Sequence, residues 1–411
     1  MTPGLGFFYM GQGVSRNNVM QTLLSSMIAM PVVTLQWFVW GYSLAFSPYG
    51  CKFIGDLNFA GFHNVAVLDF HPNAPTVNHM AFAFFQMMFA IVTPAIIFSG
   101  GAERLKMGPF VIFLVIWSTI VYDIIAYWAW APNGWFRVLG GMDFAGGMAV
   151  ETASGFSSLA VALALGPRKK RAKGSTNAPM VILGGALLWF GWIGFNAGSE
   201  GAANARASNA AMVTHLTACV AAATWMLCEY ILHKKVGNVA LINGAVAGLV
   251  CVTPAAGYIL APSCLALGVV SGVACYCMSK LRKRFADDSF DAFAVHGVAG
   301  FLGLLLTGIF AEKDIISLDG TATEGGWIDR HFIQLAYQLA GACAAAGWAF
   351  CLTFAIVKIM MWVAKCAKVS IVHDDQENID DVELGECAHA FIEPNKVFSE
   401  DKSMSNKNVD V

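Results

Sequence analysis

The sequence has 411 residues, of which 57% are hydrophobic and only 13% are charged. A soluble globular domain has roughly 25% charged residues, so this composition excludes an ordinary soluble protein and indicates one that lies mostly within a lipid bilayer. The net charge of -2 supplies no basic domain for a nucleic-acid partner. The 11 cysteines show no paired metal-ligand spacing, and we interpret them as small packing residues.

Hydropathy windows of about 20 residues predict ten membrane-spanning helices. In chain order, these are residues 19–46, 80–100, 109–129, 146–165, 179–198, 209–232, 236–256, 262–279, 292–311 and 333–364. Residues 1–13 are apolar but too short to cross a bilayer, and they have neither the basic start nor the cleavage site of a signal peptide. They are typical of the second half of an eleventh helix, so we expect a truncated first helix.

Lysine and arginine residues are concentrated in alternate loops, and loops of this kind face the cytosol. They are Arg104, Lys106, the run Arg168–Lys173, Lys234, Lys235 and the run Lys280–Arg284. This pattern places the polar C-terminal segment inside the cell. It divides the chain into a membrane domain, residues 1–365, and a cytosolic tail, residues 366–411. The loops near residues 47–78, 130–145 and 312–331 are then expected outside.

One short frame occurs twice, and each copy has an ionisable residue at its third position. Residues 149–156 and 294–301 both read Ala-Val, then Glu151 or His296, then three residues and Gly-Phe. Since successive spans reverse direction, Glu151 lies on an inward-running helix and His296 on an outward-running one, as in an inverted repeat. Each follows an aspartate, Asp143 or Asp288, by eight residues. At about 1.5 Å per residue, each lies about 12 Å from its own side of a core about 30 Å thick, so the two approach one another near the midplane.

Ionisable residues inside a membrane are costly, and they usually mark an ion or proton pathway. We therefore expect Glu151 and His296 to line such a pathway. The alternative is that they merely pair one helix with another. An intramembrane hydrolase built on them would need a nucleophile in a motif and a third metal ligand, and the sequence offers neither. The other histidines share no spacing with carboxylates, so no metal site is expected.

Several sequence blocks resemble those of the ammonium transporter family. They are Thr2–Tyr9, Gly41–Phe46, Asp143–Gly147, Gly191–Ser199, Val252–Tyr258 and Phe293–Phe301, and they occur in order along the chain. The resemblance implies an all-α polytopic membrane protein with eleven helices, in which two inverted five-helix repeats are followed by a final helix. It further implies a homotrimer in the plasma membrane, with a pore for ammonium or ammonia in each subunit and methylammonium as an analogue.

Two features depart from the family's usual pattern. Glu151 stands where most members have histidine, and in this it resembles a subset that includes some fungal transporters. The stretch Trp128–Trp135 resembles the same type. Members also carry about half a helix more before the block at Thr2–Tyr9.

The resemblance implies roles for further residues. Phe89, Trp130 and Ser199 match an outer site that recruits the cation, and Phe89 with Phe195 matches a stacked pair that closes the outer mouth. Aromatic faces attract small cations by roughly 0.5 to 2 kcal/mol each, and a hydroxyl oxygen can accept their N–H groups. Taken alone, each aromatic residue is more typical of packing.

Two aspartates match supporting positions. Asp143 is implied to support conduction, although a carboxylate at a helix start can equally serve as a cap. Asp291 is expected to orient the helix of His296 from the cytosolic side.

An ammonium ion entering a narrow apolar lumen would lose hydration worth many kcal/mol, so passage as NH3 with a separately relayed proton is easier. Two alternatives stay open: an ammonium sensor that signals through the tail, and a gas channel of the Rh type for NH3 or CO2. The tail of about 45 residues contains no recognisable domain. It departs from the family's regulatory segment at Asn378, Leu384 and His389. We expect no cofactor and no enzymatic activity.

Overall fold

The structure is a computed structural model that describes residues 1–13, 18–71, 74–168, 177–321, 323–373 and 379–385. The basic residues Lys169, Lys170, Arg171 and Lys173 lie outside the described residues, as do Asn378, His389 and most of the expected tail.

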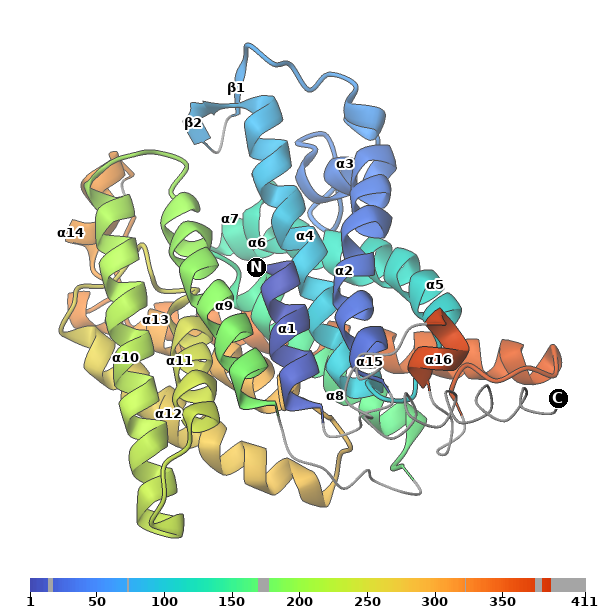
Figure 1. Ribbon diagram of the computed structural model, residues 1–411. Helices are drawn as coiled ribbons and strands as arrows, with labels where there is room; N and C mark the ends of the chain where they lie inside the picture. The colour runs from blue at the N-terminus through green and yellow to red at the C-terminus, as the bar shows by residue number, and fades with distance from the viewer. Residues whose placement is uncertain (14–17, 72–73, 169–176, 322, 374–378, 386–411) are drawn as a thin grey trace, which may run out of the picture.

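Helices make up the architecture, with one small β-hairpin (Figure 1). The helices are α1 (Thr2–Gln12), α2 (Val19–Gln36), α3 (Tyr42–Phe46), α4 (His79–Gly101), α5 (Met107–Trp117), α6 (Asp123–Trp130), α7 (Trp135–Leu139), α8 (Ala153–Leu165), α9 (Ala178–Gly198), α10 (Ala205–His233), α11 (Asn238–Val252), α12 (Ser263–Leu281), α13 (Val298–Phe310), α14 (Lys313–Ile316), α15 (Gln334–Cys366) and α16 (Ile379–Leu384). The hairpin pairs β1 (Phe70–His71) with β2 (Ala74–Asn78) in antiparallel fashion.

Every one of the ten spans expected from hydropathy is helical. Among the described residues, nine helices are long and apolar enough to cross a membrane, and α11 is a shorter apolar helix. Backbone groups cannot bond to water inside a bilayer, so long apolar segments satisfy them within a helix. Three of these helices begin at an asparagine cap, Asn78, Asn177 or Asn204, whose side chain accepts a backbone N–H of the first turn.

Four spans contain a wider, π-helical turn. These turns are Trp37–Gly41, Ser118–Tyr122, Gly147–Thr152 and Phe293–Gly297. Such turns are rare and often occur at functional sites. The third holds Glu151 and the fourth holds His296, so both copies of the repeated frame share the same local distortion.

The two copies of the frame lie on antiparallel segments that cross at their glycines. Counting α1 as the first apolar segment, they lie on the fifth and tenth, which run in opposite directions. A Cβ at Gly155 would lie 2.0 Å from the backbone nitrogen of Gly297, and a Cβ at Gly300 would lie 2.6 Å from the Cβ of Glu151. The glycine of each frame therefore lets the other frame approach to backbone contact.

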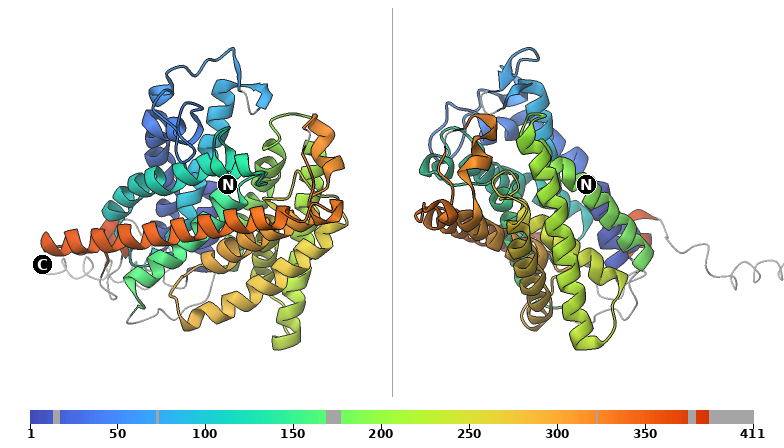
Figure 2. Two further views of the ribbon diagram at one scale, coloured as in Figure 1. Left: turned by 180° about the vertical axis from the view of Figure 1, so that it is seen from behind. Right: turned by 90° about the vertical axis from the view of Figure 1, so that its left-hand side faces the viewer.

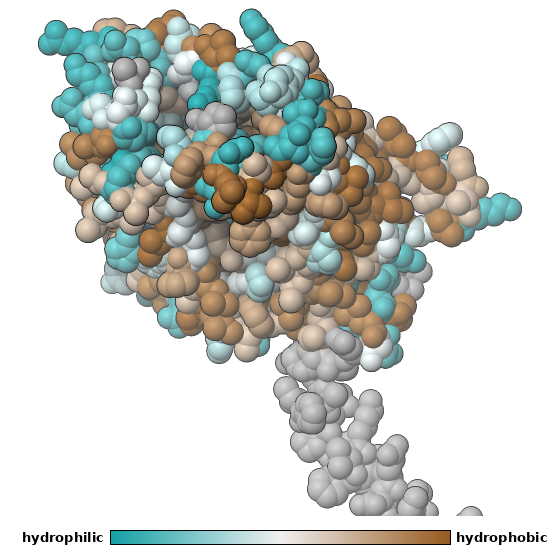
Figure 3. All heavy atoms as spheres, turned by 90° about the horizontal axis from the view of Figure 1, so that it is seen from above, coloured by the Kyte–Doolittle hydropathy of each residue, from teal (hydrophilic) through white to brown (hydrophobic). Residues whose placement is uncertain are grey.

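The β-hairpin marks one side of the molecule, which we call the hairpin side; the opposite side, with Arg104 and Arg282, is the basic side. Seen from the hairpin side, hydrophilic residues lie mainly in the upper part of the view, and hydrophobic residues cover much of the remainder (Figure 3). The long helix α15 runs obliquely across the back of the bundle (Figure 2). It is joined to α5 and α8 through Trp117, whose indole N–H lies 2.9 Å from the hydroxyl of Thr353 and 3.1 Å from that of Ser157.

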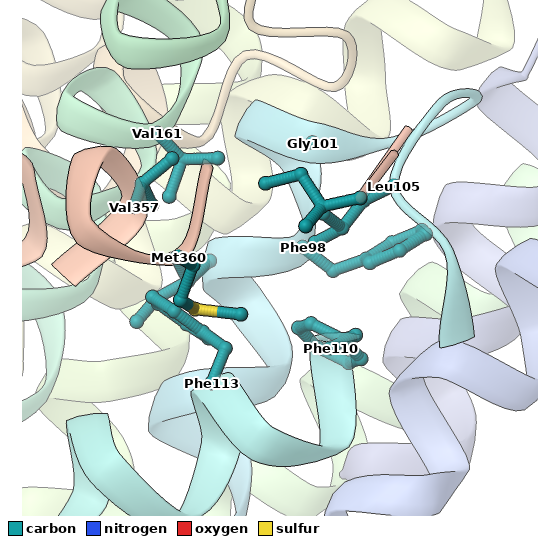
Figure 4. Close-up of a pocket in the computed structure, with 10 residues that line it drawn as sticks. Phe98, Gly101, Leu105, Phe110, Phe113, Val161, Val357 and Met360 are labelled. Carbon is teal, nitrogen blue, oxygen red and sulfur yellow. The ribbon is translucent and has the colours of Figure 1, made fainter. Parts of the chain in front are cut away.

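A small apolar cavity lies on the basic side among α4, α5, α8 and α15 (Figure 4). Its volume is about 10 Å³, and its walls include Phe98, Phe110, Phe113, Val161 and Met360. It could hold one water molecule by size, but its walls are apolar side chains that offer no hydrogen bond, so it is a packing gap.

Candidate functional site

Glu151 and His296 meet in the centre of the bundle. Glu151 is fully buried, and His296 is 3% exposed. The Nδ1 atom of His296 lies 2.7 Å from Oε2 of Glu151, which is the distance of a strong hydrogen bond. The other carboxyl oxygen, Oε1, is buried and has no hydrogen-bond partner in the described part of the chain. A buried oxygen with no donor costs free energy, so a small N–H or O–H donor beside it would be stabilised.

The pair lines a cavity of about 10 Å³. Apart from Glu151 and His296, the lining is apolar: Met1, Leu5, Val92, Ile96, Val150, Leu188, Trp192 and Phe195. A cavity of this size has room for about one molecule as large as water, and therefore for one ammonia. The cavity thus combines an apolar wall with a single polar pair.

Trp192 gives this cavity an aromatic wall that the sequence did not single out. Its ring lies 6.4 Å from that of His296 at an angle of 22°. Its indole N–H donates to the hydroxyl of Thr253 at 2.9 Å, which fixes the plane of the ring. Trp192 and Thr253 lie 61 residues apart. Both fall inside family blocks, and that was the available signal.

Phe89 and Phe195 close the cavity toward the hairpin side. Their rings are stacked with centroids 4.1 Å apart at 23°, and Phe195 also lines the cavity. Helix α4 starts at the hairpin side, so Phe89 precedes the cavity residues Val92 and Ile96 on the way in. The predicted stacked pair is therefore present as a geometric feature.

Trp130 lies beyond this pair. Its ring meets that of Phe89 edge to face at 5.8 Å, and its indole N–H donates to the backbone carbonyl of Asp143 at 2.9 Å. A second ring, Phe46, is parallel to Trp130 within 6° at 6.4 Å. The aromatic faces thus form a continuous group from the hairpin side to the cavity, with the orientation of Trp130 set by a backbone bond.

Ser199 lies one helical turn beyond Phe195, on the wall of a larger cavity of about 630 Å³. Thr76 and Val77 of β2 also line this cavity, which places it on the hairpin side. The hydroxyl of Ser199 donates to the backbone carbonyl of Phe195 at 2.8 Å. Its donor is therefore used, and its lone pairs are left to accept a bond from an N–H group.

Asp143 caps the π-helical turn that carries Glu151. Its carboxylate accepts the backbone N–H groups of Gly146 at 3.0 Å, Met148 at 2.9 Å and Ala149 at 3.3 Å. The capping arrangement considered from the sequence is thus present. Through its own carbonyl, Asp143 also holds Trp130, so one residue joins the aromatic group to the helix of Glu151.

The equivalent aspartate on the other frame is Asp288. Its carboxylate accepts the N–H of Phe293 at 2.9 Å, five residues on, just as Asp143 accepts that of Met148. Ser99 and Ser158 also donate to it. The side chain of Asp291 instead forms an ion pair with Arg282, and its own backbone has a positive φ of 62°. The carboxylate that bonds to the turn of His296 is therefore that of Asp288, and Asp291 ties the preceding loop to the end of α12.

Comparisons with known proteins identify the family to which this chain belongs. A family model described as Ammonium Transporter Family matches residues 1–389. Ammonium transporter 1 of Schizosaccharomyces pombe is 40% identical over 399 residues, which cover 95% of this chain and 80% of that protein. Ammonium transporter MEP2 of Saccharomyces cerevisiae is 40% identical over 405 residues, with the same coverage. The crystal structure of Candida albicans Mep2 superposes with a TM-score of 0.85 at 37% identity, covering 99% of this chain and 89% of that one. The family match and the similarity of sequence and fold show that the chain belongs to the ammonium transporter family.

Proposed function

We propose that this protein transports ammonium across a membrane, recruiting NH4+ at the hairpin side and conducting NH3 together with a separately carried proton. The relatives that share about 40% of its residues are named ammonium transporters. The observation that carries the proposal is the cavity lined by Glu151 and His296, which has room for about one small molecule.

Recruitment is assigned to the aromatic group and to Ser199. Trp130 and Phe89 present ring faces and edges, and Ser199 keeps acceptor capacity. Ring faces attract a cation as it sheds water, and the hydroxyl oxygen favours a cation that carries N–H groups. Phe89 and Phe195 then act as a gate, because the stacked rings must part for a molecule to enter the cavity.

The proton relay is assigned to Glu151 and His296. A neutral molecule crosses an apolar cavity at far lower cost than an ion does, so the proton needs its own carrier. The bond of 2.7 Å allows a proton to pass between Oε2 and Nδ1 with little movement. With Glu151 on one helix and His296 on the other, the two halves of the relay are chemically different, a carboxyl group and an imidazole.

The remaining assignments follow the charge pattern and the family. We place the hairpin side outside the cell and the basic side in the cytosol, with the tail cytosolic. We also propose that the protein forms a homotrimer in the plasma membrane, with a separate pore in each subunit. Asp143 supports the recruitment site, and Asp291 supports the helix of His296 indirectly, through the loop that it ties to Arg282.

Growth tests this function. Expression in cells that lack their own ammonium uptake should restore growth on low ammonium, with weaker transport of methylammonium. A protein that reaches the surface and assembles but fails to rescue growth would contradict the proposal.

Currents on a solid-supported membrane then distinguish the modes of transport. Liposomes containing purified protein should give a transient positive current when ammonium is added. A change of internal pH without current would indicate a neutral gas channel of the Rh type. Binding without current or pH change would indicate a sensor.

A further inference from the structure

Arg206 is a nearly buried cation at the start of α10, on the hairpin side. It is 5% exposed. Its guanidinium carbon lies 5.4 Å from the ring centre of Phe144 and 5.2 Å from that of Tyr258. Its Nε donates to the backbone carbonyl of Gly257 at 2.7 Å. Two rings and a carbonyl thus hold the guanidinium in one place, which is unusual for a side chain with so many rotamers.

This group is continuous with the recruitment site. Phe144 follows Asp143, whose carbonyl orients Trp130. The backbone N–H of Phe144 donates to the carbonyl of Pro254 at 3.1 Å. Its ring lies so close to Gly257 that a Cβ there would meet it at 2.0 Å. A shift of Arg206 would therefore disturb the loop that carries Asp143.

Two carboxylates face the same guanidinium. Asp319 forms an ion pair with it, and Oε2 of Glu200 lies 3.5 Å from its Nε. Glu200 directly follows Ser199, and its other oxygen accepts the amide N–H of Asn204 at 2.8 Å. Burial raises the pKa of Glu200, and nearby Asp319 adds to this rise, whereas the bond from Asn204 and the charge of Arg206 oppose it. Without Arg206, Glu200 and Asp319 would stand beside the recruitment site without the cation that both of them contact.

We propose that Arg206 is a positioning residue that offsets part of the carboxylate charge at the outer mouth, so that selection of ammonium depends more on the aromatic rings and the hydroxyl and less on attraction by fixed anions. This inference rests on the proposed transport of ammonium. A carboxylate attracts K+, Na+ and ammonium alike through their charge, whereas rings and a hydroxyl acceptor distinguish them by hydration and N–H groups. By offsetting the negative charge of Glu200 and Asp319, Arg206 improves discrimination of ammonium from K+ and Na+. The cost is a weaker attraction of all three cations.

The test compares Arg206→Gln with the triple variant Arg206→Gln/Glu200→Gln/Asp319→Asn in liposome current assays. The single variant should show a roughly threefold lower apparent KM for ammonium and a similar gain in competition by K+ at an ionic strength of about 10 mM. Both changes should fade at about 200 mM, where charges are screened within about 7 Å. The triple variant, which lacks all three charges, should lose this gain, with competition by K+ no stronger than in the wild type.

Other outcomes separate charge from structure. A single variant with wild-type KM and wild-type K+ competition overturns the inference, and so does a triple variant that stays as altered as the single one. If Arg206→Gln does not assemble, Asp319→Asn serves instead. It removes one negative charge and leaves Arg206 paired with Glu200, so the KM for ammonium should rise at low salt, and an unchanged KM would overturn the inference. A wild-type protein that gives no ammonium current contradicts the proposed function itself, whereas a wild-type current with unaltered variants contradicts only the role of Arg206.

Discussion

A single hydrogen bond joins Glu151 and His296 at the centre of this protein. The other carboxyl oxygen of Glu151 has no hydrogen-bond partner among the described residues. Glu151→Gln keeps the shape and one acceptor oxygen but removes the titrating group. We expect ammonium-evoked current to fall, or its dependence on pH to change between about pH 5 and 8, while assembly persists. Currents at matched surface expression measure this. Wild-type amplitude and pH dependence in Glu151→Gln would show that the carboxylate is structural.

Two further variants test the same pair of residues. His296→Ala should reduce the current further, because it interrupts the relay and leaves Glu151 buried without its partner. Glu151→His places a second imidazole beside His296, so it should conduct with a shifted pH profile.

Replacement of Trp130 is expected to weaken the recognition of ammonium. Trp130→Leu removes an aromatic face next to Phe89 and leaves the relay in place. A loss of about 1 kcal/mol corresponds to a roughly fivefold weaker apparent affinity, with reduced discrimination against K+. Trp362→Leu is the control, because Trp362 is 65% exposed on α15. If the two variants had the same apparent affinity for ammonium and the same competition by K+, Trp130 would serve only in packing.

At the scale of helices, the crossing of the two frames depends on glycine. A Cβ at Gly155 would lie 2.0 Å from a backbone nitrogen, and backbone cannot move aside as a flexible side chain can. Gly155→Ala should therefore lower stability by about 3 kcal/mol or prevent assembly. Gly194→Ala is the matched control, since a Cβ there meets nothing within 4 Å and alanine favours a helix. Thermal unfolding in detergent compares the two; equal melting temperatures would contradict a close crossing at Gly155.

An ion cluster on the basic side connects the ends of α4 and α8 to the loop before α13. Arg168 binds Glu103 and Asp287. Burial alone would raise the pKa of Asp287, but the guanidinium and backbone N–H of Arg168 outweigh it and hold this pKa well below its ordinary value. A lowered pKa stabilises the fold above the unfolded pKa of about 4, and this contribution is lost as the pH falls through the folded value.

Arg168→Met should therefore lower the melting temperature clearly at pH 7, and the deficit should narrow progressively below about pH 4. Lys235 is exposed, so the control variant Lys235→Met should change neither the melting temperature at pH 7 nor its dependence on pH. A deficit of constant size from pH 7 to pH 3 would show that the ion pair is not its source.

Over the whole molecule, the spans were predictable because a bilayer forces long apolar segments into helices. The meeting of Glu151 with His296 was predictable because a repeated frame on antiparallel segments brings equivalent positions together. Helix α11 ends at Val252, four residues earlier than hydropathy indicated, because Thr253–Tyr258 form turns that bond to the loop of Phe144. Hydropathy does not register such turns.

The arrangement of polar side chains was less predictable. Asp287, Asp288 and Asp291 lie within five residues, and the sequence does not show which carboxylate turns toward a helix N-terminus and which toward an arginine. The surroundings of Arg206 were not predictable, because the two rings and two carboxylates around it come from separate segments. Only the folded chain brings such groups together.

The cavity beside Glu151, with its volume of about 10 Å³, has a kinetic consequence. A space that admits one water-sized molecule cannot hold a second substrate or a hydration shell at the same moment. Each pore then empties before it refills, so initial flux should follow a simple hyperbola in ammonium concentration with a Hill coefficient of one. Methylammonium, which carries an additional carbon, must push the walls apart at every passage. Its slower transport would therefore reflect the time that the side chains need to move, even where its binding at the mouth is as strong as that of ammonium.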